Sequence, residues 1–481
     1  MNEQSFEKYG LSEELLKSIS KLGYKNPTKV QNEVIPYVLE GRDLIVGSQT
    51  GSGKTASFGI PVCERIEVEI REPQALILTP TRELCVQVKE DISNIGRFKK
   101  IRCASVFGKQ PVSIQIKELK QRVHVVVGTP GRTMDLIERG SLILENIKYL
   151  IIDEADKMLN MGFIEQVEAV INTLPREKVT MLFSATIHEE IEILCSKYMI
   201  KPIRVEVSPE SKTVEKIEQV LYEISDSEKF NLLNKIIYIE NPDSCIIFCR
   251  TKENVENLYL KMKNKGYSCS ALHGGMLQDD RLETMLKFKN GEFSFLIATD
   301  VAARGIDIED LSHIINYDIP VEKESYVHRI GRTGRAGSFG KAITFVNPHE
   351  LKISQGIQDY IGYIIPKKEV PSEEEANRAQ KIFSIKSSNK PKLKTSKSLL
   401  LNKEITKIYI NAGKKKKIRA GDIVGAVTGI DGVDAEDIGI VDIMDNYSYI
   451  DVLNGKGELI LEALQYTMIK GKTIRAQRAA K

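Results

Sequence analysis

The stretch that most constrains the fold is residues 46–55, with the sequence VGSQTGSGKT. The apolar run before it predicts a buried strand, and the pattern from Ala56 onward predicts a helix. Glycines let the backbone turn sharply, so that successive N–H groups can point at an anion, and the helix start adds its positive dipole end. In a polyphosphate-binding loop of this kind, Lys54 contacts the β- and γ-phosphates and Thr55 supplies a hydroxyl to Mg²⁺. The strict pattern has Gly where Ser48 stands, and the alternative is an ordinary glycine-rich turn.

Short apolar runs alternate with helical patterns through the first 207 residues. The runs are residues 44–46, 75–78, 104–106, 124–127, 149–152 and 181–183. Because these runs are continuous rather than alternating, they predict strands that are buried on both faces. Strands that alternate with helices predict an α/β fold with a doubly wound parallel sheet, whose functional residues lie beyond the carboxyl ends of the strands.

The same pattern restarts after residue 216. Apolar runs occur at residues 245–248, 269–272, 295–298, 313–315 and 343–346. They predict a second doubly wound domain, which has no phosphate loop of its own. Two similar domains with one nucleotide loop suggest a shared ligand cleft.

The pattern weakens after residue 365. Residues 372–383 fit a helix, and residues 384–403 are rich in Lys and Ser, as is typical of a tether. From residue 405 we expect a strand at 407–411, a helix at 420–428, a hairpin of 438–443 and 447–453, a helix at 459–466 and a last strand at 473–476. This β-α-β-β-α-β order is the topology of RNA-recognition modules. The predicted parts are therefore two α/β domains, 1–207 and 208–365, a basic linker, 366–403, and an RRM-like domain, 404–481.

Charge and composition narrow the function classes. The first 365 residues hold 47 Lys and Arg against 51 Asp and Glu, whereas residues 366–403 hold ten against four. Positive charge is therefore concentrated in the linker, which suggests contact with a polyanion or simply a solvated tether. We expect no membrane span, because no apolar run approaches about 18 residues. The chain start has no signal pattern and the seven cysteines are scattered, which favours a cytoplasmic protein with reduced thiols.

Two adjacent carboxylates follow the apolar run at 149–152. In a nucleotide hydrolase with a Lys-Thr loop, Asp153 is expected to hold Mg²⁺ through water, and Glu154 to orient and deprotonate the attacking water. An acidic helix start is the alternative interpretation. Because both motifs end strands of one predicted sheet, we favour the catalytic interpretation.

The sequence DEAD at 153–156 gives its name to the DEAD-box RNA helicases, which the chain resembles over residues 6–365. The resemblance implies two tandem RecA-like domains, ATP and Mg²⁺ as cofactors, and RNA as partner. It also implies adenine recognition by Tyr24 and Gln31 of a Q motif, GYKNPTKVQ. The ATP-binding residues implied are Tyr24, Gln31, Ser48, Gln49, Thr50, Gly51, Ser52, Gly53, Lys54, Thr55 and Asp307.

Other motifs match the family's RNA-binding and coupling elements. The sequences PTREL at 80–84, TPGR at 129–132, QDDR at 278–281 and TD at 299–300 imply RNA contacts. The implied RNA-binding residues of the body are Arg82, Thr129, Arg132, Arg281 and Thr299. The sequence SAT implies that Ser184 and Thr186 couple hydrolysis to unwinding by hydrogen bonding to the carboxylate pair. Where the family has a Gly-Gly pair, this chain has Gly108-Lys109, and Lys109 offers a further phosphate contact.

The last family motif is YVHRIGRTGR at 326–335. By resemblance, Arg332 and Arg335 are arginine fingers for the transition-state charge, and His328 links to the DEAD and SAT motifs. The family mechanism then follows: ATP and RNA both favour a closed state of two domains, and hydrolysis reopens it. Outside this context, such a stretch is more often a basic surface patch.

The C-terminal unit resembles the RNA-binding domain of DbpA-type helicases. Its run GKKKKIR supplies the expected phosphate-contacting residues, Lys414, Lys415, Lys416, Lys417 and Arg419. Tyrosines on the sheet face offer stacking instead, and a solvated basic loop is the bland alternative. The resemblance implies a hairpin of 23S ribosomal RNA as target, pre-50S particles as partners and a role in large-subunit assembly. We expect a monomer; the alternatives are a general RNA helicase, an ATP-gated RNA clamp and, least favoured, a DNA translocase.

Overall fold

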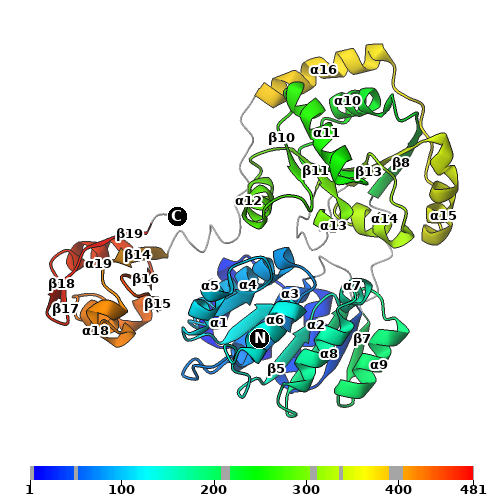
Figure 1. Ribbon diagram of the computed structural model, residues 1–481. Coiled ribbons are helices and arrows are strands. Elements are labelled where there is room, and N and C mark those ends of the chain that lie inside the picture. The colour runs from blue at the N-terminus through cyan, green and yellow to red at the C-terminus, as the bar shows by residue number, and fades with distance from the viewer. Residues whose placement is uncertain are drawn as a thin grey trace. The chain divides into compact units, whose positions relative to one another are not determined.

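The computed structural model describes residues 5–47, 53–206, 217–303, 311–334, 340–388 and 405–479. By its internal contacts the chain divides into two units, residues 1–207 with 395–481, and residues 208–394. We describe three bodies, each by itself, because each has its own sheet and core (Figure 1). Among the described residues, no helix combines the length and apolarity needed to cross a bilayer.

The first body is built on a parallel sheet with the order β3-β4-β2-β5-β6-β1-β7. Its strands are β1 (Leu44–Gly47), β2 (Ala75–Leu78), β3 (Cys103–Val106), β4 (Val125–Gly128), β5 (Tyr149–Ile152), β6 (Val179–Ser184) and β7 (Ile203–Glu206). The helices are η1 (Phe6–Tyr9), α1 (Glu13–Lys21), α2 (Lys29–Leu39), α3 (Lys54–Arg65), α4 (Arg82–Ile95), α5 (Val112–Leu119), α6 (Pro130–Glu138), α7 (Ala155–Asn160), α8 (Ile164–Asn172) and α9 (Glu189–Tyr198). The predicted strands are confirmed to within about two residues, and β7 was missed.

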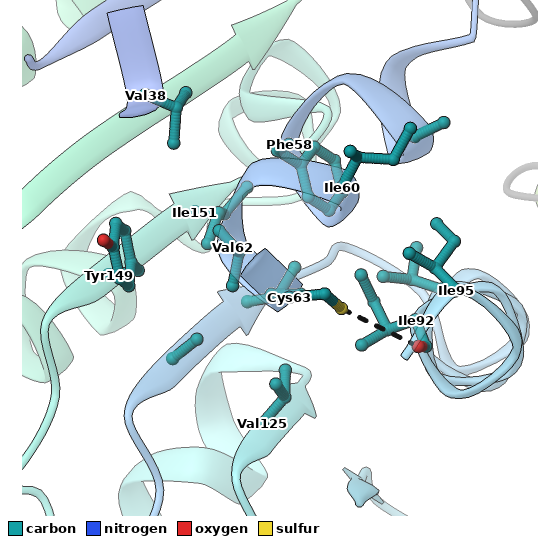
Figure 2. Packing of buried hydrophobic residues seen from close by; sticks show 14 of the residues in the cluster. Val38, Phe58, Ile60, Val62, Cys63, Ile92, Ile95, Val125, Tyr149 and Ile151 are labelled. Carbon is teal, nitrogen blue, oxygen red and sulfur yellow. Dashed lines mark hydrogen bonds between the residues drawn. The ribbon is translucent and has the colours of Figure 1, made fainter. Parts of the chain in front are cut away.

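Apolar side chains bury both faces of this sheet, as the continuous runs predicted. Neighbouring residues of β5 enter opposite cores, with Ile151 in one and Ile152 in the other. Figure 2 shows the first core, where Cys63 of α3 lies beside α4 and its Sγ is 3.9 Å from the carbonyl oxygen of Ile92. Burial raises the pKa of the Cys63 thiol to about 12, so this cysteine acts as a small core residue.

The second body repeats the design, with the parallel order β10-β11-β9-β12-β13-β8. Its strands are β8 (Ile217–Glu223), β9 (Cys245–Cys249), β10 (Cys269–Leu272), β11 (Phe295–Thr299), β12 (His313–Asn316) and β13 (Gly340–Val346). The helices are α10 (Lys229–Glu240), α11 (Lys252–Asn264), α12 (Gln278–Lys289), α13 (Asp300–Ala303), α14 (Lys323–Ile330), η2 (Pro348–Glu350), α15 (Leu351–Ile361) and α16 (Glu373–Ser388). Here β8 was missed.

Part of the segment that we expected to be a linker packs on this second body. Helix α16 is longer than the predicted helix and runs beside α10 (Figure 1). The Phe383 ring lies 5.6 Å from Tyr238 and 5.8 Å from Tyr267, measured between centroids. An ion pair of 2.8 Å joins Lys235 to Glu373. Residues up to 388 therefore belong structurally to this body, and residues 389–404 lie outside the described residues.

The C-terminal body is an antiparallel sheet with the order β15-β16-β14-β19 and helices on one face. Its elements are β14 (Thr406–Ile410), η3 (Lys414–Lys416), α18 (Ala420–Thr428), η4 (Ala435–Asp437), β15 (Ile438–Ile443), β16 (Ser448–Val452), α19 (Gly457–Leu464), β17 (Met468–Ile469), β18 (Lys472–Thr473) and β19 (Ala476–Arg478). The β-α-β-β-α-β topology is confirmed. The last strand was wrongly placed: residues 468–473 form a small hairpin, β17–β18, and the strand that joins the main sheet begins at Ala476.

A buried histidine in the first body, His124, makes hydrogen bonds that fit its neutral form. The Nδ1 of His124 accepts a hydrogen bond from the Arg102 N–H at 2.9 Å, and its Nε2 lies 3.2 Å from the carbonyl oxygen of Val68. The neutral Nε2–H tautomer satisfies both partners, whereas a second ring proton would face an N–H. Burial lowers the pKa of His124 to about 4, and the bond to Val68 opposes this only partly.

We expect His124 to lower the free energy of unfolding as the pH falls. Its pKa is lower in the folded state than the usual value of about 6.5, so the unfolded chain binds the extra proton between pH 6.5 and 4. The free energy of unfolding of residues 1–207 should fall by up to about 3 kcal/mol over that window, beyond the effect of other groups. Urea titrations at pH 5 and 7 measure it. His124→Gln should reduce the change in the free energy of unfolding between the two pH values. If this variant changes as much as the wild type, the pH dependence comes from other groups.

Candidate functional site

A lysine and three carboxylates lie together beyond the carboxyl ends of β1 and β5. Lys54 is the first residue of α3 and only 7% exposed. Burial lowers its pKa, and the negative charges of Asp153, Glu154 and Asp156 act in the opposite direction. The predicted phosphate-loop lysine and the DEAD carboxylates are therefore electrostatic neighbours in the first body.

The two adjacent carboxylates differ in their surroundings. Burial raises the pKa of Asp153, and the positive charge of Lys54 opposes only part of this shift. The Oδ1 of Asp153 is buried without a hydrogen-bond partner among the described residues. Glu154 precedes α7 in the left-handed conformation, with φ 55° and ψ 51°, and its Oε1 accepts from Lys157 Nζ at 2.6 Å. Lys157 is a neighbour that our sequence reasoning missed; the signal was a lysine three residues beyond Glu154, on the following helix.

The Q motif forms a cap on α2 and contacts the end of the phosphate loop. The Gln31 Oε1 accepts from the Thr28 N–H at 2.9 Å, which completes a capping box. The Gln31 Nε2 donates to the Gly53 carbonyl at 3.3 Å, so the side chain that we expected to bind adenine is here engaged with protein. The half-buried Tyr24 meets the Phe6 ring edge-on at 6.3 Å.

Gly53 is the described one of the two glycines between β1 and α3. It has φ 91°, and a Cβ there would lie 2.7 Å from Gln31 Nε2, so both its conformation and its space favour glycine. Thr55 follows Lys54 on α3 and is half-buried. Several predicted site residues lie outside the described residues: Ser48, Gln49, Thr50, Gly51, Ser52, Asp307 and Arg335.

The SAT motif is tied to the last DEAD residue. Ser184 Oγ accepts from the Asp156 N–H at 3.2 Å and donates to the Thr186 carbonyl at 2.6 Å. Thr186 Oγ1 lies 3.4 Å from Asp156 Oδ2 and 3.0 Å from His188 Nε2. The hydroxyls of Ser184 and Thr186 thus contact Asp156, which lies on α7 just after β5.

A second group of polar residues follows β2, β3 and β4. Arg132, on α6, donates from Nη1 to the Gln110 carbonyl and to Gln115 Oε1, both at 3.0 Å. A Cβ on Gly108 would lie 3.7 Å from the Arg82 guanidinium, so this arginine faces the same loop. Thr129 precedes α6, after β4. The structure therefore places two predicted RNA-binding residues of this body, Arg82 and Arg132, at residues 108–110. The third, Thr129, donates its N–H to the Val106 carbonyl at 3.0 Å, at the end of β3.

In the second body, a buried arginine organises the ends of the strands. Arg329 donates to both oxygens of Asp300 at 2.6 Å, to Asn316 Oδ1 at 3.0 Å and to the Asp318 carbonyl at 2.7 Å. It joins β11 and β12 to α14. No role was predicted for Arg329, although it lies inside the YVHRIGRTGR motif.

Asp318 extends this hydrogen-bond network. Its Oδ2 accepts from the Arg250 N–H at 2.9 Å and from Asn254 Nδ2 at 3.0 Å, and its Oδ1 from the buried Lys229 at 3.2 Å. The other predicted residues of this body lie on several elements. Thr299 ends β11, Arg281 lies on α12, the exposed His328 lies on α14, and the buried Arg332 follows α14.

Comparison with known proteins places these elements in a family. Residues 28–194 match the DEAD/DEAH box helicase model, residues 228–337 the helicase conserved C-terminal domain, and residues 407–478 the DbpA RNA binding domain. The chain is 56% identical over 476 residues to ATP-dependent RNA helicase DbpA of Bacillus subtilis, covering 99% of both chains. It is 42% identical over 381 residues to the DEAD-box ATP-dependent RNA helicase CshA of Geobacillus kaustophilus, covering 79% of this chain and 82% of that relative.

Solved structures agree with the sequence relatives. Dbp5 of S. cerevisiae bound to RNA and ADP BeF3 is 34% identical, with a TM-score of 0.70, covering 80% of this chain and all of that one. Mss116p bound to ssRNA and AMP-PNP is 28% identical, with a TM-score of 0.68, covering 78% of this chain and 80% of that one. The chain belongs to the DEAD-box family of ATP-dependent RNA helicases and carries a C-terminal RNA-binding domain of the DbpA type. The predicted resemblance, the tandem RecA-like fold and RNA as partner are thereby confirmed.

Proposed function

We propose that ATP is hydrolysed beside Lys54 and the DEAD carboxylates. The observation that supports this most is the placement of Lys54, Asp153 and Glu154 as electrostatic neighbours beyond the ends of β1 and β5. Lys54 neutralises phosphate charge, and the backbone N–H groups of the loop donate hydrogen bonds to the phosphates. The loop residues in this role are Ser48, Gln49, Thr50, Gly51, Ser52 and Gly53. Glu154 takes the proton of the attacking water. Tyr24 and Gln31 recognise adenine, which requires the Gln31 amide to exchange a bond to protein for bonds to the base.

A magnesium ion fits this site. The buried Oδ1 of Asp153 lacks a hydrogen-bond partner among the described residues, and a carboxylate oxygen is a preferred magnesium ligand. Asp153, through water, and the hydroxyl of Thr55 would hold the ion, which supplies Lewis-acid polarisation of the phosphates.

The coupling and RNA-contacting roles follow from the groups beyond the other strands. We propose that Ser184 and Thr186 transmit the state of the carboxylate cluster through Asp156. Arg332 and Arg335 act as arginine fingers that stabilise the charge of the transferring phosphoryl group. Asp307 contacts the ribose, and His328 links this motif to the DEAD and SAT motifs. The proposed RNA contacts of the body are Arg82, Thr129, Arg132, Arg281 and Thr299.

Lys109 is a further phosphate-contacting residue in this proposal. It is exposed, at φ 63°, in the loop that Arg82 and Arg132 face. A left-handed lysine is strained by about 1 kcal/mol, so Lys109→Gly should not lower the melting temperature. It should weaken binding of a single-stranded RNA severalfold and reduce the slope of log affinity against log salt by about 0.7.

The matched control for this prediction is Lys201→Gly. Lys201 is also exposed and left-handed, with φ 46°, but it precedes the amino end of β7. Fluorescence anisotropy over a salt series compares the two variants. An unchanged slope for Lys109→Gly, or an equal change for Lys201→Gly, would contradict the contact.

We further propose that the substrate is 23S ribosomal RNA in the cytoplasm, with pre-50S particles as partners and the monomer as the working form. Phosphate contacts position RNA without reading its sequence, so the preference for one RNA over others must come from another part of the chain. The DbpA RNA binding domain match at residues 407–478 and the resemblance to DbpA-type helicases support this target. A general RNA helicase and an ATP-gated clamp are the alternatives.

The test compares ATP hydrolysis stimulated by a hairpin fragment of large-subunit ribosomal RNA and by an unrelated structured RNA of equal length, at one salt concentration. We expect half-maximal stimulation at a far lower concentration of the ribosomal fragment. A chain that ends at Ser388, which keeps α16 on the second body, should lose this preference and retain stimulation at high RNA. Equal stimulation of the full chain would favour a general helicase, and ATP hydrolysis without duplex release would favour a clamp.

A further inference from the structure

A buried lysine that takes no part in the hydrolysis described above lies beside the DEAD carboxylates. Lys157 Nζ donates to Glu154 Oε1 at 2.6 Å, and only 11% of the lysine side chain and 7% of the glutamate side chain are exposed. On an exposed helix such a pair contributes little, because water screens both charges. Burying an ammonium is costly unless a carboxylate compensates it. The pair therefore belongs to the interior of the candidate site and is not surface decoration.

The first turn of α7 fixes the spacing of the two side chains. Glu154 precedes this helix, and its carbonyl oxygen accepts hydrogen bonds from the N–H groups of Lys157 at 3.0 Å and Met158 at 3.1 Å. Side chains three residues apart on a helical turn are neighbours, so Lys157 stands beside the Glu154 carboxylate. The same turn thus holds both the backbone and the side chain of Glu154.

Lys157 also competes with the lysine of the phosphate loop for this carboxylate. The negative charge of Glu154 acts on Lys54, so Lys54 is a second cation within electrostatic reach. Burial lowers the pKa of Lys54, and the charge of Lys157 adds to this shift. Of the two cations, Lys157 makes the bond of 2.6 Å to Glu154. This arrangement keeps the Glu154 carboxylate in one orientation and keeps the Lys54 charge for the phosphates.

The start of α7 is itself held by the SAT motif. Asp156, the residue before Lys157, donates its N–H to Ser184 Oγ at 3.2 Å, and its Oδ2 lies 3.4 Å from Thr186 Oγ1. The turn that carries Lys157 is therefore fixed from β6 and from the residues that follow it. A lysine on a turn held in this way can set the direction of a neighbouring side chain precisely.

We propose that Lys157 is a positioning residue for ATP hydrolysis, which holds Glu154 Oε1 so that the other carboxylate oxygen faces the attacking water. Lys157 acts through Glu154 and touches neither ATP nor this water. In the step itself, Glu154 takes a proton of the water, the water oxygen bonds to the γ-phosphorus, and the bond from that phosphorus to the bridging oxygen breaks, so that ADP leaves with the electron pair. The inference rests on the proposed role of Glu154 as the base.

The test measures kcat and the KM for ATP of the full chain in steady-state hydrolysis, with a structured RNA at saturating concentration. Lys157→Met keeps the length of the side chain and removes its charge. It should lower kcat about 10- to 100-fold, because a misplaced reacting group slows the chemical step, and leave the KM for ATP within about twofold. Lys157→Arg keeps a cation that can bind a carboxylate oxygen and should recover kcat to within about threefold of the wild type.

A double-mutant comparison shows whether Lys157 acts through Glu154. Glu154→Gln already removes the base, so the addition of Lys157→Met should cause no further loss in single-turnover hydrolysis. A general structural defect would lower hydrolysis by the same factor in both backgrounds, which would overturn the proposal. Circular dichroism sets the assay temperature below the unfolding transition of every variant. If Lys157→Met does not fold, Lys157→Gln takes its place with the same expectations.

The matched control is Lys197→Met on α9 of the same body, where the exposed Lys197 pairs with Glu168 at 2.9 Å. It removes a lysine–glutamate pair away from the cluster and should leave kcat unchanged. Wild-type kcat in Lys157→Met, no recovery in Lys157→Arg, or faster hydrolysis without RNA in Lys157→Met would overturn the proposal. Failure of the proposed function itself is distinct, because Glu154→Gln would then hydrolyse ATP at the wild-type rate.

Discussion

Replacing Glu154 with Gln is expected to lower RNA-stimulated ATP turnover by about 10²- to 10⁴-fold, the usual contribution of a general base. Gln has the same shape and can keep the left-handed backbone at φ 55° and a hydrogen bond from Lys157. It cannot take a proton from water. Because Lys54 and Asp153 are untouched, ATP affinity should stay within about threefold of the wild-type value.

Single-turnover hydrolysis and titration with a fluorescent ATP analogue measure the two quantities separately. Glu165→Gln, at the exposed start of α8, makes the same chemical change away from the cluster and should behave as the wild type. Normal turnover in Glu154→Gln would remove this residue as the base. Lost ATP binding would instead mean that its charge organises the ground state.

Replacing Arg332 with Gln is expected to lower kcat by about 10³-fold or more, the range known for arginine fingers. Its neighbour Arg329 provides the contrast, because its partners are structural residues of the second body. Arg329 donates two hydrogen bonds of 2.6 Å to the Asp300 carboxylate and a third to Asn316. Arg329→Gln leaves a partly buried carboxylate without its cation and should destabilise the second body by about 3–5 kcal/mol.

Calorimetry and steady-state ATP hydrolysis separate the two effects. We expect Arg332→Gln to lose turnover at temperatures where the second body is still folded, and Arg329→Gln to lower the melting temperature of the second body first. If both variants lose stability equally, Arg332 is a structural residue. If Arg332→Gln keeps most of its turnover, it is not an arginine finger.

The strands were predictable where both faces of a sheet are buried. The runs at β5 and β9 are continuous and apolar, and the structure has strands there. β7 and β8 were missed because both are edge strands. Their sequences, IRVE and IEQVLYE, mix charged with apolar residues, so a search for continuous runs passes over them.

The candidate site was predictable only in part, for a related reason. Lys54 lies beyond β1, and Asp153 and Glu154 follow β5 of the same parallel sheet, so their meeting follows from the strand pattern. Lys157 and the pairing of Ser184 with Asp156 depend on helix entry and on the contact of β5 with β6. Arg329 also required the structure, because Asp300 follows β11 and Asn316 ends β12, two strands that are not neighbours in the sheet.

The sequence by itself determined the succession of buried strands and helices, the phosphate loop, the carboxylate pair and the C-terminal topology, because burial periodicity and turn chemistry are local properties of a chain. The tertiary structure decided which distant side chains meet. It placed Lys470 and Lys472 beside Lys417 and Lys416, and α16 beside α10. Such contacts depend on strand order and on the path of each connection, and neither is written in any single stretch of residues.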